Sequence, residues 1–202
     1  EAIAPADGRT IADVTLTYFE AVSQAVSCPV FIYQPPGTSE DYMVTIDVIR
    51  RLADLPNVVA IKLSTNDAQY ILDMAWAVAG KDFAVITGAE TAFLAGLASG
   101  TRAVIGQGST VNPQILCAIQ TRFEAGDLPG ARDAQRAANR LVQESVNAVE
   151  FMKRYATEHG YPVKPFSRSM ASNAYGKHRP ALSDEDYGQF KGLLESELPA
   201  FL

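Results

Sequence analysis

The sequence predicts an α/β protein built around a parallel sheet. Four short apolar runs, rich in β-branched residues, recur at residues 29–33, 58–63, 83–87 and 102–106. Each run is followed by a segment whose apolar residues keep helical spacing. The runs are continuously apolar rather than alternating, which predicts strands buried on both faces by covering helices.

The first elements follow from signals ahead of the second run. Residues 2–4 are expected to be the end of a further strand, and residues 11–26 a helix that leads into the first run. Thr38 is followed three residues later by Asp41, a spacing that suits a capping box. This predicts a helix over residues 43–53, with its apolar residues on one face.

The helices between the later strands have comparable start signals. Asn66 is expected to cap a helix over residues 68–79, and a shorter helix is expected over residues 91–99. The Asn-Pro pair at 112–113 is a cap followed by proline at the first helical position, and it opens a helix over residues 114–124. Each predicted strand therefore has its own helix.

The alternation of strand and helix stops in the last third of the chain. Residues 128–159 carry one long helical pattern or two, and residues 160–180 are expected to be an irregular connection with three prolines. Ser183 is expected to cap a last helix that ends near residue 198.

The spacing of the predicted strands leaves the architecture open. The strand starts lie roughly 20 to 28 residues apart, which suits both an open doubly wound sheet and part of a (β/α)8 barrel. A complete barrel takes about 250 residues, so a chain of 202 residues with a helical C-terminal part would hold about half of one.

Composition argues against some classes of function. The chain has 17 Lys and Arg against 23 Asp and Glu, a formal net charge of −6, and no basic patch for nucleic acid. It has no apolar run of about 18 residues and no signal-peptide pattern, so we expect a soluble, cytoplasmic protein without membrane contact. Cys28 and Cys117 are expected to be buried free thiols rather than a disulfide.

Two further kinds of site are disfavoured. The two histidines, His159 and His178, lack the spacing of metal ligands, so no metal is expected. The glycine-containing turn at residues 106–110 suits a phosphate, but Val111 stands where a dinucleotide fingerprint needs its third glycine. A phosphate site is therefore a minor alternative.

The most informative residue is Lys62, which stands inside the second apolar run. The strand pattern predicts that Lys62 is buried, and a buried ammonium is costly unless its pKa falls. A lysine of that kind is a nucleophile for carbonyl carbons and forms a Schiff base. Alternatively, Lys62 reaches water at the strand mouth or pairs with Glu90. Tyr33, at the end of the first run, is either an acid or base or a packing residue of the wall.

Several stretches together resemble one family. The chain matches, in order and spacing, the back half of the dihydrodipicolinate synthase and N-acetylneuraminate lyase family. The matching stretches are Ile-Tyr-Gln-Pro-Pro at 32–36, Leu-Pro-Asn with its apolar run and lysine at 55–62, residues 83–88, and residues 100–113. The second of these is the most specific.

The resemblance implies a (β/α)8 barrel with extra C-terminal helices, and this chain would supply strands five to eight and the helical tail. Residues 1–126 would then be the second half of the barrel, and residues 127–202 the last barrel helix and the C-terminal extension. We also expect roughly 100 more residues upstream in the functional protein, judged by typical barrel length. The family further implies a homo-oligomer, commonly a tetramer.

The resemblance also implies roles for six residues. Lys62 would form the imine with the keto carbon of pyruvate or another 2-oxo acid, and Tyr33, on the neighbouring strand about 4.8 Å away, would relay protons. This chemistry needs no metal or cofactor, because the protonated imine accepts the electron pair. The substrate-binding positions implied are Gly88 and Ile105 by their backbones, and Ser64 and Glu90 by their side chains. For Ser64 and Glu90, solvated loop polarity is the alternative.

Departures from the synthase branch guide the choice of reaction. That branch has an arginine shortly after the tyrosine-containing strand, and residues 36–40 contain none. We therefore favour a lyase that cleaves a 2-oxo sugar acid or related 2-oxo acid, with aldehyde as the other partner. Alternatives within the family are a 2-oxo acid dehydratase and dihydrodipicolinate synthase itself. The alternative of another class is a non-catalytic relative that binds a 2-oxo acid.

Overall fold

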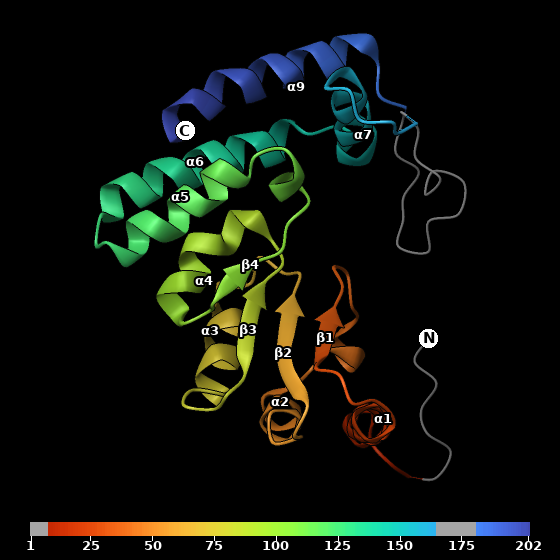
Figure 1. Cartoon of the computed structure of the whole chain (residues 1–202). Helices are drawn as coiled ribbons and strands as arrows, with labels where there is room; N and C mark the ends of the chain where they lie inside the picture. Colours follow the sequence, from red (N-terminus) through yellow and green to blue (C-terminus); the bar gives the residue numbers. More distant parts are fainter. Residues whose placement is uncertain (1–7, 165–180) are drawn as a thin grey trace. The chain divides into compact units, whose positions relative to one another are not determined.

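The computed structural model describes residues 8–164 and 181–202, and the chain forms two compact units, Glu1–Ile105 and Gly106–Leu202 (Figure 1). The units are separated by packing, whereas the boundary expected after residue 126 marks the end of the strand and helix alternation and stays a prediction. The strand expected at residues 2–4 and most of the connection expected at 160–180 lie outside the described residues.

The first unit contains a four-stranded parallel sheet in the order β1-β2-β3-β4. The strands are β1 (Val30–Gln34), β2 (Val58–Leu63), β3 (Ala84–Thr87) and β4 (Ala103–Val104). The four predicted strands are confirmed, although the last is two residues long instead of five. Its backbone bonds to β3 nevertheless begin at the Arg102 N–H and extend to the Ile105 N–H.

The register between β1 and β2 has one irregularity. Val30 lies opposite Val58, but Phe31 lies opposite Ala60, so the pairing skips Val59. From there the pairing is regular, and it places Tyr33 opposite Lys62. Because paired residues of neighbouring strands share a face, the irregularity decides which β2 residue accompanies Tyr33.

The helices of the first unit pack against one face of the sheet. They are α1 (Ile11–Ala25), α2 (Ile46–Leu52), α3 (Ala68–Ala77) and α4 (Phe93–Ser99), with the short 3-10 turns η1 (Glu40–Tyr42) and η2 (Glu90–Ala92). The sheet contributes Ile32, Ile61 and Val85 to a core that also contains buried residues of α1, α2 and α3.

Within these 202 residues the opposite face of β1 is exposed, so the burial expected on both faces is seen on one face only. Phe31 is 59% exposed and Tyr33 is 51% exposed, while Ile32 between them is 2% exposed. The side chains of β1 therefore alternate although all three residues are apolar or aromatic. Apolar character predicted the strand correctly, but it does not state how many faces are covered.

Two helix caps differ from the predicted ones. The hydroxyl of Thr45, rather than that of Thr38, caps α2, because η1 separates Thr38 from the helix. The carboxylate of Asp67, rather than the amide of Asn66, caps α3. The Asn66 side-chain oxygen instead accepts a hydrogen bond from the Thr91 hydroxyl at 2.6 Å, which joins the loop after β2 to η2.

Asn57, in the Leu-Pro-Asn stretch ahead of β2, joins three segments. Its side-chain nitrogen lies 3.0 Å from the carbonyl oxygens of Ser23 and Val26 and 3.3 Å from that of Cys28. These carbonyls belong to the end of α1 and the turn into β1. Asn57 therefore fixes the start of β1 relative to β2.

The second unit is helical. It contains η3 (Gly108–Thr110), α5 (Pro113–Glu124), α6 (Leu128–Glu144), α7 (Ala148–Glu158), α9 (Asp184–Glu197) and η4 (Leu198–Phe201). The pattern over 128–159 therefore corresponds to two helices. Asn112 occupies the cap position of α5 as predicted, but its side chain makes no capping bond. Buried alanines of α6, including Ala134 and Ala138, allow α5 to pack closely.

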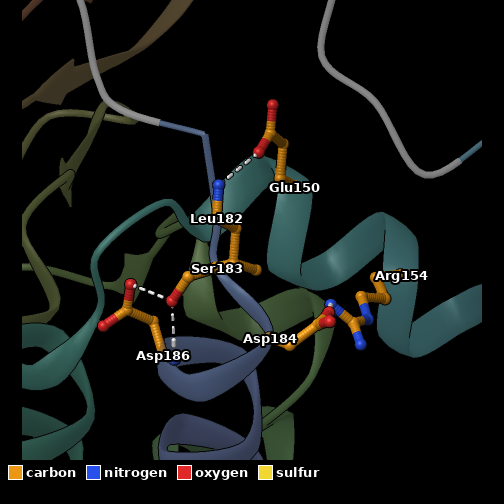
Figure 2. A network of polar contacts seen from close by, with 6 residues as sticks. All are labelled: Glu150, Arg154, Leu182, Ser183, Asp184 and Asp186. Carbon is orange, nitrogen blue, oxygen red and sulfur yellow. Dashed lines mark hydrogen bonds and ion pairs between the residues drawn. The ribbon is translucent and has the colours of Figure 1, made fainter.

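Polar contacts hold the start of α9 against α7, as Figure 2 shows. Ser183 caps α9 as predicted, since its hydroxyl accepts the Asp186 N–H at 3.0 Å. The Leu182 N–H donates to Glu150 of α7 at 2.9 Å. Arg154 of α7 forms an ion pair with Asp184 at 2.7 Å. The start of α9 is thus joined to α7 at two residues, Leu182 and Asp184.

The cysteine prediction is partly wrong. Cys28 and Cys117 are free thiols, as expected, but both are exposed rather than buried. Cys28 lies in the turn ahead of β1, and Cys117 lies on α5. Their apolar neighbours in sequence predicted burial, but neither side chain faces a core.

Candidate active site

Lys62 and Tyr33 form the centre of the candidate site. They lie on adjacent parallel strands and directly opposite each other, as predicted. The Lys62 Nζ atom lies 4.7 Å from the centroid of the Tyr33 ring. At this distance the ammonium interacts favourably with the ring face. The sheet therefore brings an amine and a phenol together on its open face.

Lys62 is half-buried, which lies between the predicted burial and the alternative of a lysine that reaches water at the strand mouth. Its neighbours Ile61 and Leu63 are completely buried because they face the helices, whereas Lys62 faces the open side with Tyr33. The strand pattern overestimated the burial for the same reason as in β1. The amine is consequently within reach of a small molecule at this face.

Gly88 and Ser64 follow the ends of β3 and β2, where the two backbones approach closely. The Gly88 N–H donates to the Leu63 carbonyl at 2.7 Å. A Cβ atom on Gly88 would lie 2.8 Å from that carbonyl oxygen and 2.8 Å from the Ser64 Cα, which is too close for any side chain. Glycine at this position therefore allows Ser64 to lie beside the end of β3, two residues beyond Lys62.

Glu90 and Ile105 complete the set of predicted binding residues. Glu90 begins η2 and is 6% exposed, so it is not the solvated loop carboxylate that the alternative interpretation expected. Ile105 follows β4 and is 47% exposed, and its N–H donates a hydrogen bond to the Thr87 carbonyl oxygen at 2.9 Å. All six predicted residues thus lie at or just beyond the carboxyl ends of the four strands. Their roles toward a substrate stay predictions.

Sequence reasoning missed two residues behind the site, Gln34 and Tyr70. Gln34 ends β1 and is 6% exposed, and its side-chain oxygen accepts the Val44 N–H at 2.9 Å. The Tyr70 hydroxyl lies 3.0 Å from the same oxygen and 2.6 Å from the Val44 carbonyl oxygen. Burial raises the pKa of Tyr70 to about 12. The strand alternation signals that Gln34 faces the helices, but nothing in the sequence connects it with α3.

The described residues offer no sign of a metal centre or a membrane span. Residues 8–164 and 181–202 contain no cluster of three His, Cys, Asp or Glu side chains that could hold a metal. His159 packs against the Tyr155 ring at the end of α7, and His178 lies outside the described residues. Among the described helices, none is long and apolar enough to cross a bilayer.

Comparison with known proteins gives consistent matches. The model of the dihydrodipicolinate synthetase family matches residues 8–185. A 4-hydroxy-tetrahydrodipicolinate synthase from Nitrosospira multiformis is 37% identical over 125 residues, which are 61% of this chain and 41% of that enzyme. The chain therefore spans about two fifths of the length of this relative.

Two solved structures share the fold. One is a sialic acid aldolase from Ruminococcus gnavus, which has also been solved as a catalytic lysine mutant. Its alignment spans all of this chain and 66% of the aldolase chain, with a TM-score of 0.79 and 21% identity. A prophage protein of the dihydrodipicolinic acid synthase family from E. coli, solved with pyruvate, covers 94% of this chain and 62% of its own, with a TM-score of 0.72 and 22% identity. The predicted fold class, an α/β chain forming part of a (β/α)8 barrel, is confirmed.

Proposed function

The chain belongs to the dihydrodipicolinate synthetase family, and from this premise we propose that it supplies the Schiff-base site of a carbon–carbon lyase acting on a 2-oxo acid. The observation that carries the proposal is the pairing of Lys62 with Tyr33, whose ring centroid lies 4.7 Å from Nζ. Carbonyl chemistry of this kind needs an accessible amine beside a group that can exchange protons.

Two relatives support this choice of residues and substrate. The Ruminococcus gnavus aldolase has a catalytic lysine, and the E. coli family member binds pyruvate. Lys62 is the lysine at the carboxyl end of the described sheet, on its open face. Both relatives are under 25% identical to this chain and share its fold, and the proposed role of Lys62 is tested by trapping the imine.

The first chemical step would be formation of the imine. The Lys62 ammonium first gives up a proton to water, the free Nζ amine attacks the keto carbon of the 2-oxo acid, and the resulting carbinolamine loses water to leave a protonated imine. The Tyr33 phenol would supply the proton with which the hydroxyl leaves as water. The backbones at Gly88 and Ile105 follow the ends of β3 and β4, where they would let the 2-oxo acid approach the sheet closely.

The second step would be cleavage of the carbon–carbon bond. Tyr33 accepts the proton of the hydroxyl that becomes the aldehyde oxygen, and the bonding electron pair moves into the imine to give an enamine. Protonation of the enamine carbon and hydrolysis then release the 2-oxo acid and restore Lys62. No external cofactor is needed in this scheme, because the imine itself accepts the electron pair.

The substrate we propose is a 2-oxo sugar acid or a related 2-oxo acid. Residues 36–40 lack the arginine expected for a synthase, and Ser64 with the buried Glu90 offers polar groups for substrate hydroxyls. Dehydratase or synthase chemistry on the same imine is the alternative reaction, and a 2-oxo-acid-binding relative is the alternative of another class. We further propose a cytoplasmic homo-oligomer, with the tetramer as the expected form.

Borohydride trapping with pyruvate tests the proposal. We expect a reduced pyruvyl group on the peptide that contains Lys62, and its loss in Lys62→Arg, because the guanidinium is not a nucleophile at neutral pH. Lys164→Arg, at an exposed lysine of the second unit, is the matched control and should be labelled like the wild type. Peptide mass spectrometry measures the adduct. An unlabelled Lys62 in the folded full-length protein would overturn the proposal in favour of a binding relative.

A further inference from the structure

The Tyr33 ring needs support from elsewhere, because little packing surrounds it. Its side chain is 51% exposed on the open face of the sheet, and its ring contacts the Lys62 ammonium. A half-exposed ring on a strand has several rotamers available. The position of the Tyr33 ring therefore depends on how firmly the end of β1 is held.

The residue that holds the end of β1 is Gln34. Its side chain points to the helix-covered face and is 6% exposed. The side-chain oxygen accepts the Val44 N–H at 2.9 Å, and the backbone oxygen accepts the Ser64 N–H at 3.1 Å. Gln34 thus joins the strand carrying Tyr33 to the segment ahead of α2 and to the residue two positions beyond Lys62.

Tyr70 completes this connection from α3. Its hydroxyl lies 3.0 Å from the Gln34 side-chain oxygen and 2.6 Å from the Val44 carbonyl oxygen. The Tyr70 hydroxyl has one proton to share between these two acceptors, so it links the two ends of the segment between Gln34 and Val44. The Tyr70 backbone is itself fixed, because its N–H donates to the capping carboxylate of Asp67 at 3.0 Å.

We infer that Gln34 and Tyr70 are positioning residues for the Lys62–Tyr33 pair, holding the end of β1 where the Tyr33 ring lies against the Lys62 ammonium. The inference rests on the proposed function. Neither residue faces the open side of the sheet, so neither touches the substrate. Tyr70 stays protonated, and therefore remains a donor, throughout the neutral range, since burial raises its pKa to about 12.

Removing the Tyr70 hydroxyl should affect the rate of imine formation and leave pyruvate binding nearly unchanged. Tyr70→Phe keeps the ring packing and removes the bonds to Gln34 and Val44. A small displacement of a reacting group costs up to about a hundredfold in rate, so we expect the maximal trapping rate to fall by about tenfold or more. The pyruvate concentration at half-maximal rate should stay within about twofold, because no substrate contact is lost.

The test compares wild type, Tyr70→Phe and the control Tyr18→Phe, which changes a 62% exposed tyrosine on α1. Trapping rates are measured over a range of pyruvate concentrations, and urea unfolding shows that each variant is folded at the assay temperature. Gln34→Met removes the same bond from its other end and should act in the same direction. A merely structural role would lower stability without changing the maximal rate of the folded protein.

A second readout separates this inference from the proposed function. The ring signal of Tyr33, observed by NMR in tyrosine-labelled protein, reports its place beside the Lys62 ammonium without any reaction. We expect this signal to move in Tyr70→Phe and to stay in Tyr18→Phe. If wild type forms no pyruvate adduct but the Tyr33 signal moves in Tyr70→Phe, the proposed function is refuted and the positioning role of Tyr70 is supported. A wild-type trapping rate and an unmoved signal in Tyr70→Phe would overturn the inference alone.

Discussion

The reactivity proposed for Lys62 would depend on its place on the sheet rather than on burial. Its strand neighbours Ile61 and Leu63 are fully buried in the core, so the backbone at Lys62 is firmly held. Its own side chain faces the open side beside Tyr33 and is half-buried. A rigid backbone with an accessible amine is the combination that nucleophilic attack on a small carbonyl compound requires.

Removing the Tyr33 hydroxyl tests its share in this chemistry. In Tyr33→Phe we expect the Lys62 adduct with pyruvate to form still, but at a maximal trapping rate lower by about a hundredfold, which is the usual loss of a general acid or base. The rate of borohydride trapping measures the effect. Tyr42→Phe, at a 47% exposed tyrosine of η1, is the control. Equal rates in Tyr33→Phe and wild type would exclude a proton-relay role.

Tyr70 should make stability depend on pH above 10. Its pKa is raised to about 12 in the folded protein, whereas an unfolded tyrosine titrates near 10. Above pH 10 the unfolded state loses this proton first, so stability falls as pH rises, by about 1 kcal/mol at pH 12 when the partial exposure of Tyr70 is allowed for. We expect the advantage of wild type over Tyr70→Phe in urea unfolding to shrink by this amount between pH 9 and pH 12. A constant difference would show that the hydroxyl is solvated.

At the residue scale, the sequence identifies the reactive groups better than their supports. Lys62 and Tyr33 stand out because a lysine lies inside one apolar run and a tyrosine closes another, on strands that are neighbours. Gln34 and Tyr70 do not stand out, because their bond joins a strand to a helix 36 residues further along the chain. Such a contact depends on tertiary packing, which local periodicity does not contain.

At the element scale, the close approach of β2 and β3 depends on Gly88. In Gly88→Ala the new methyl group would meet the Leu63 carbonyl and the Ser64 Cα, both backbone atoms that move little. We expect a loss of about 1–3 kcal/mol in the free energy of unfolding, together with slower trapping at Lys62. Urea unfolding measures the first effect.

The matched control for this substitution is Gly188→Ala on α9. Nothing lies within 4 Å of a Cβ atom there, so the added methyl group should raise stability by up to about 1 kcal/mol through helix propensity. Opposite signs at the two glycines are the expected result. Equal and small effects would mean that the ends of β2 and β3 separate at little cost.

Element positions were predictable where several signals coincide. The limits predicted for β2 match the structure at both ends, because a turn precedes the apolar run and polar residues follow it. The caps of α2 and α3 were assigned to the wrong residues, because several neighbouring polar side chains can cap and only the path of the loop selects one. The predicted run at 102–106 is longer than β4, in which only Ala103 and Val104 pair regularly with β3.

At the scale of the whole chain, the exposed face of β1 is an apolar surface that can pack against another molecule. Phe31 and Tyr33, 59% and 51% exposed, lie on the same face of this strand. We expect the 202-residue chain to associate as its concentration rises, and Phe31→Ser to weaken that association. Sedimentation of both proteins over a range of concentrations measures it. Val14→Ser, on the outer side of α1, is the control, and an equal effect of both substitutions would contradict a specific role for this face.

The skipped residue between β1 and β2 has a consequence for how this family of sequences can change in length. Deleting Val59 would leave Phe31 opposite Ala60 and Tyr33 opposite Lys62, now in an uninterrupted ladder. A deletion or insertion after Ala60 would instead bring Lys62 opposite Ile32 or Gln34 and turn it toward the helices. Loss of Val59 should therefore leave Tyr33 opposite Lys62, whereas a gain or loss after Ala60 should separate them.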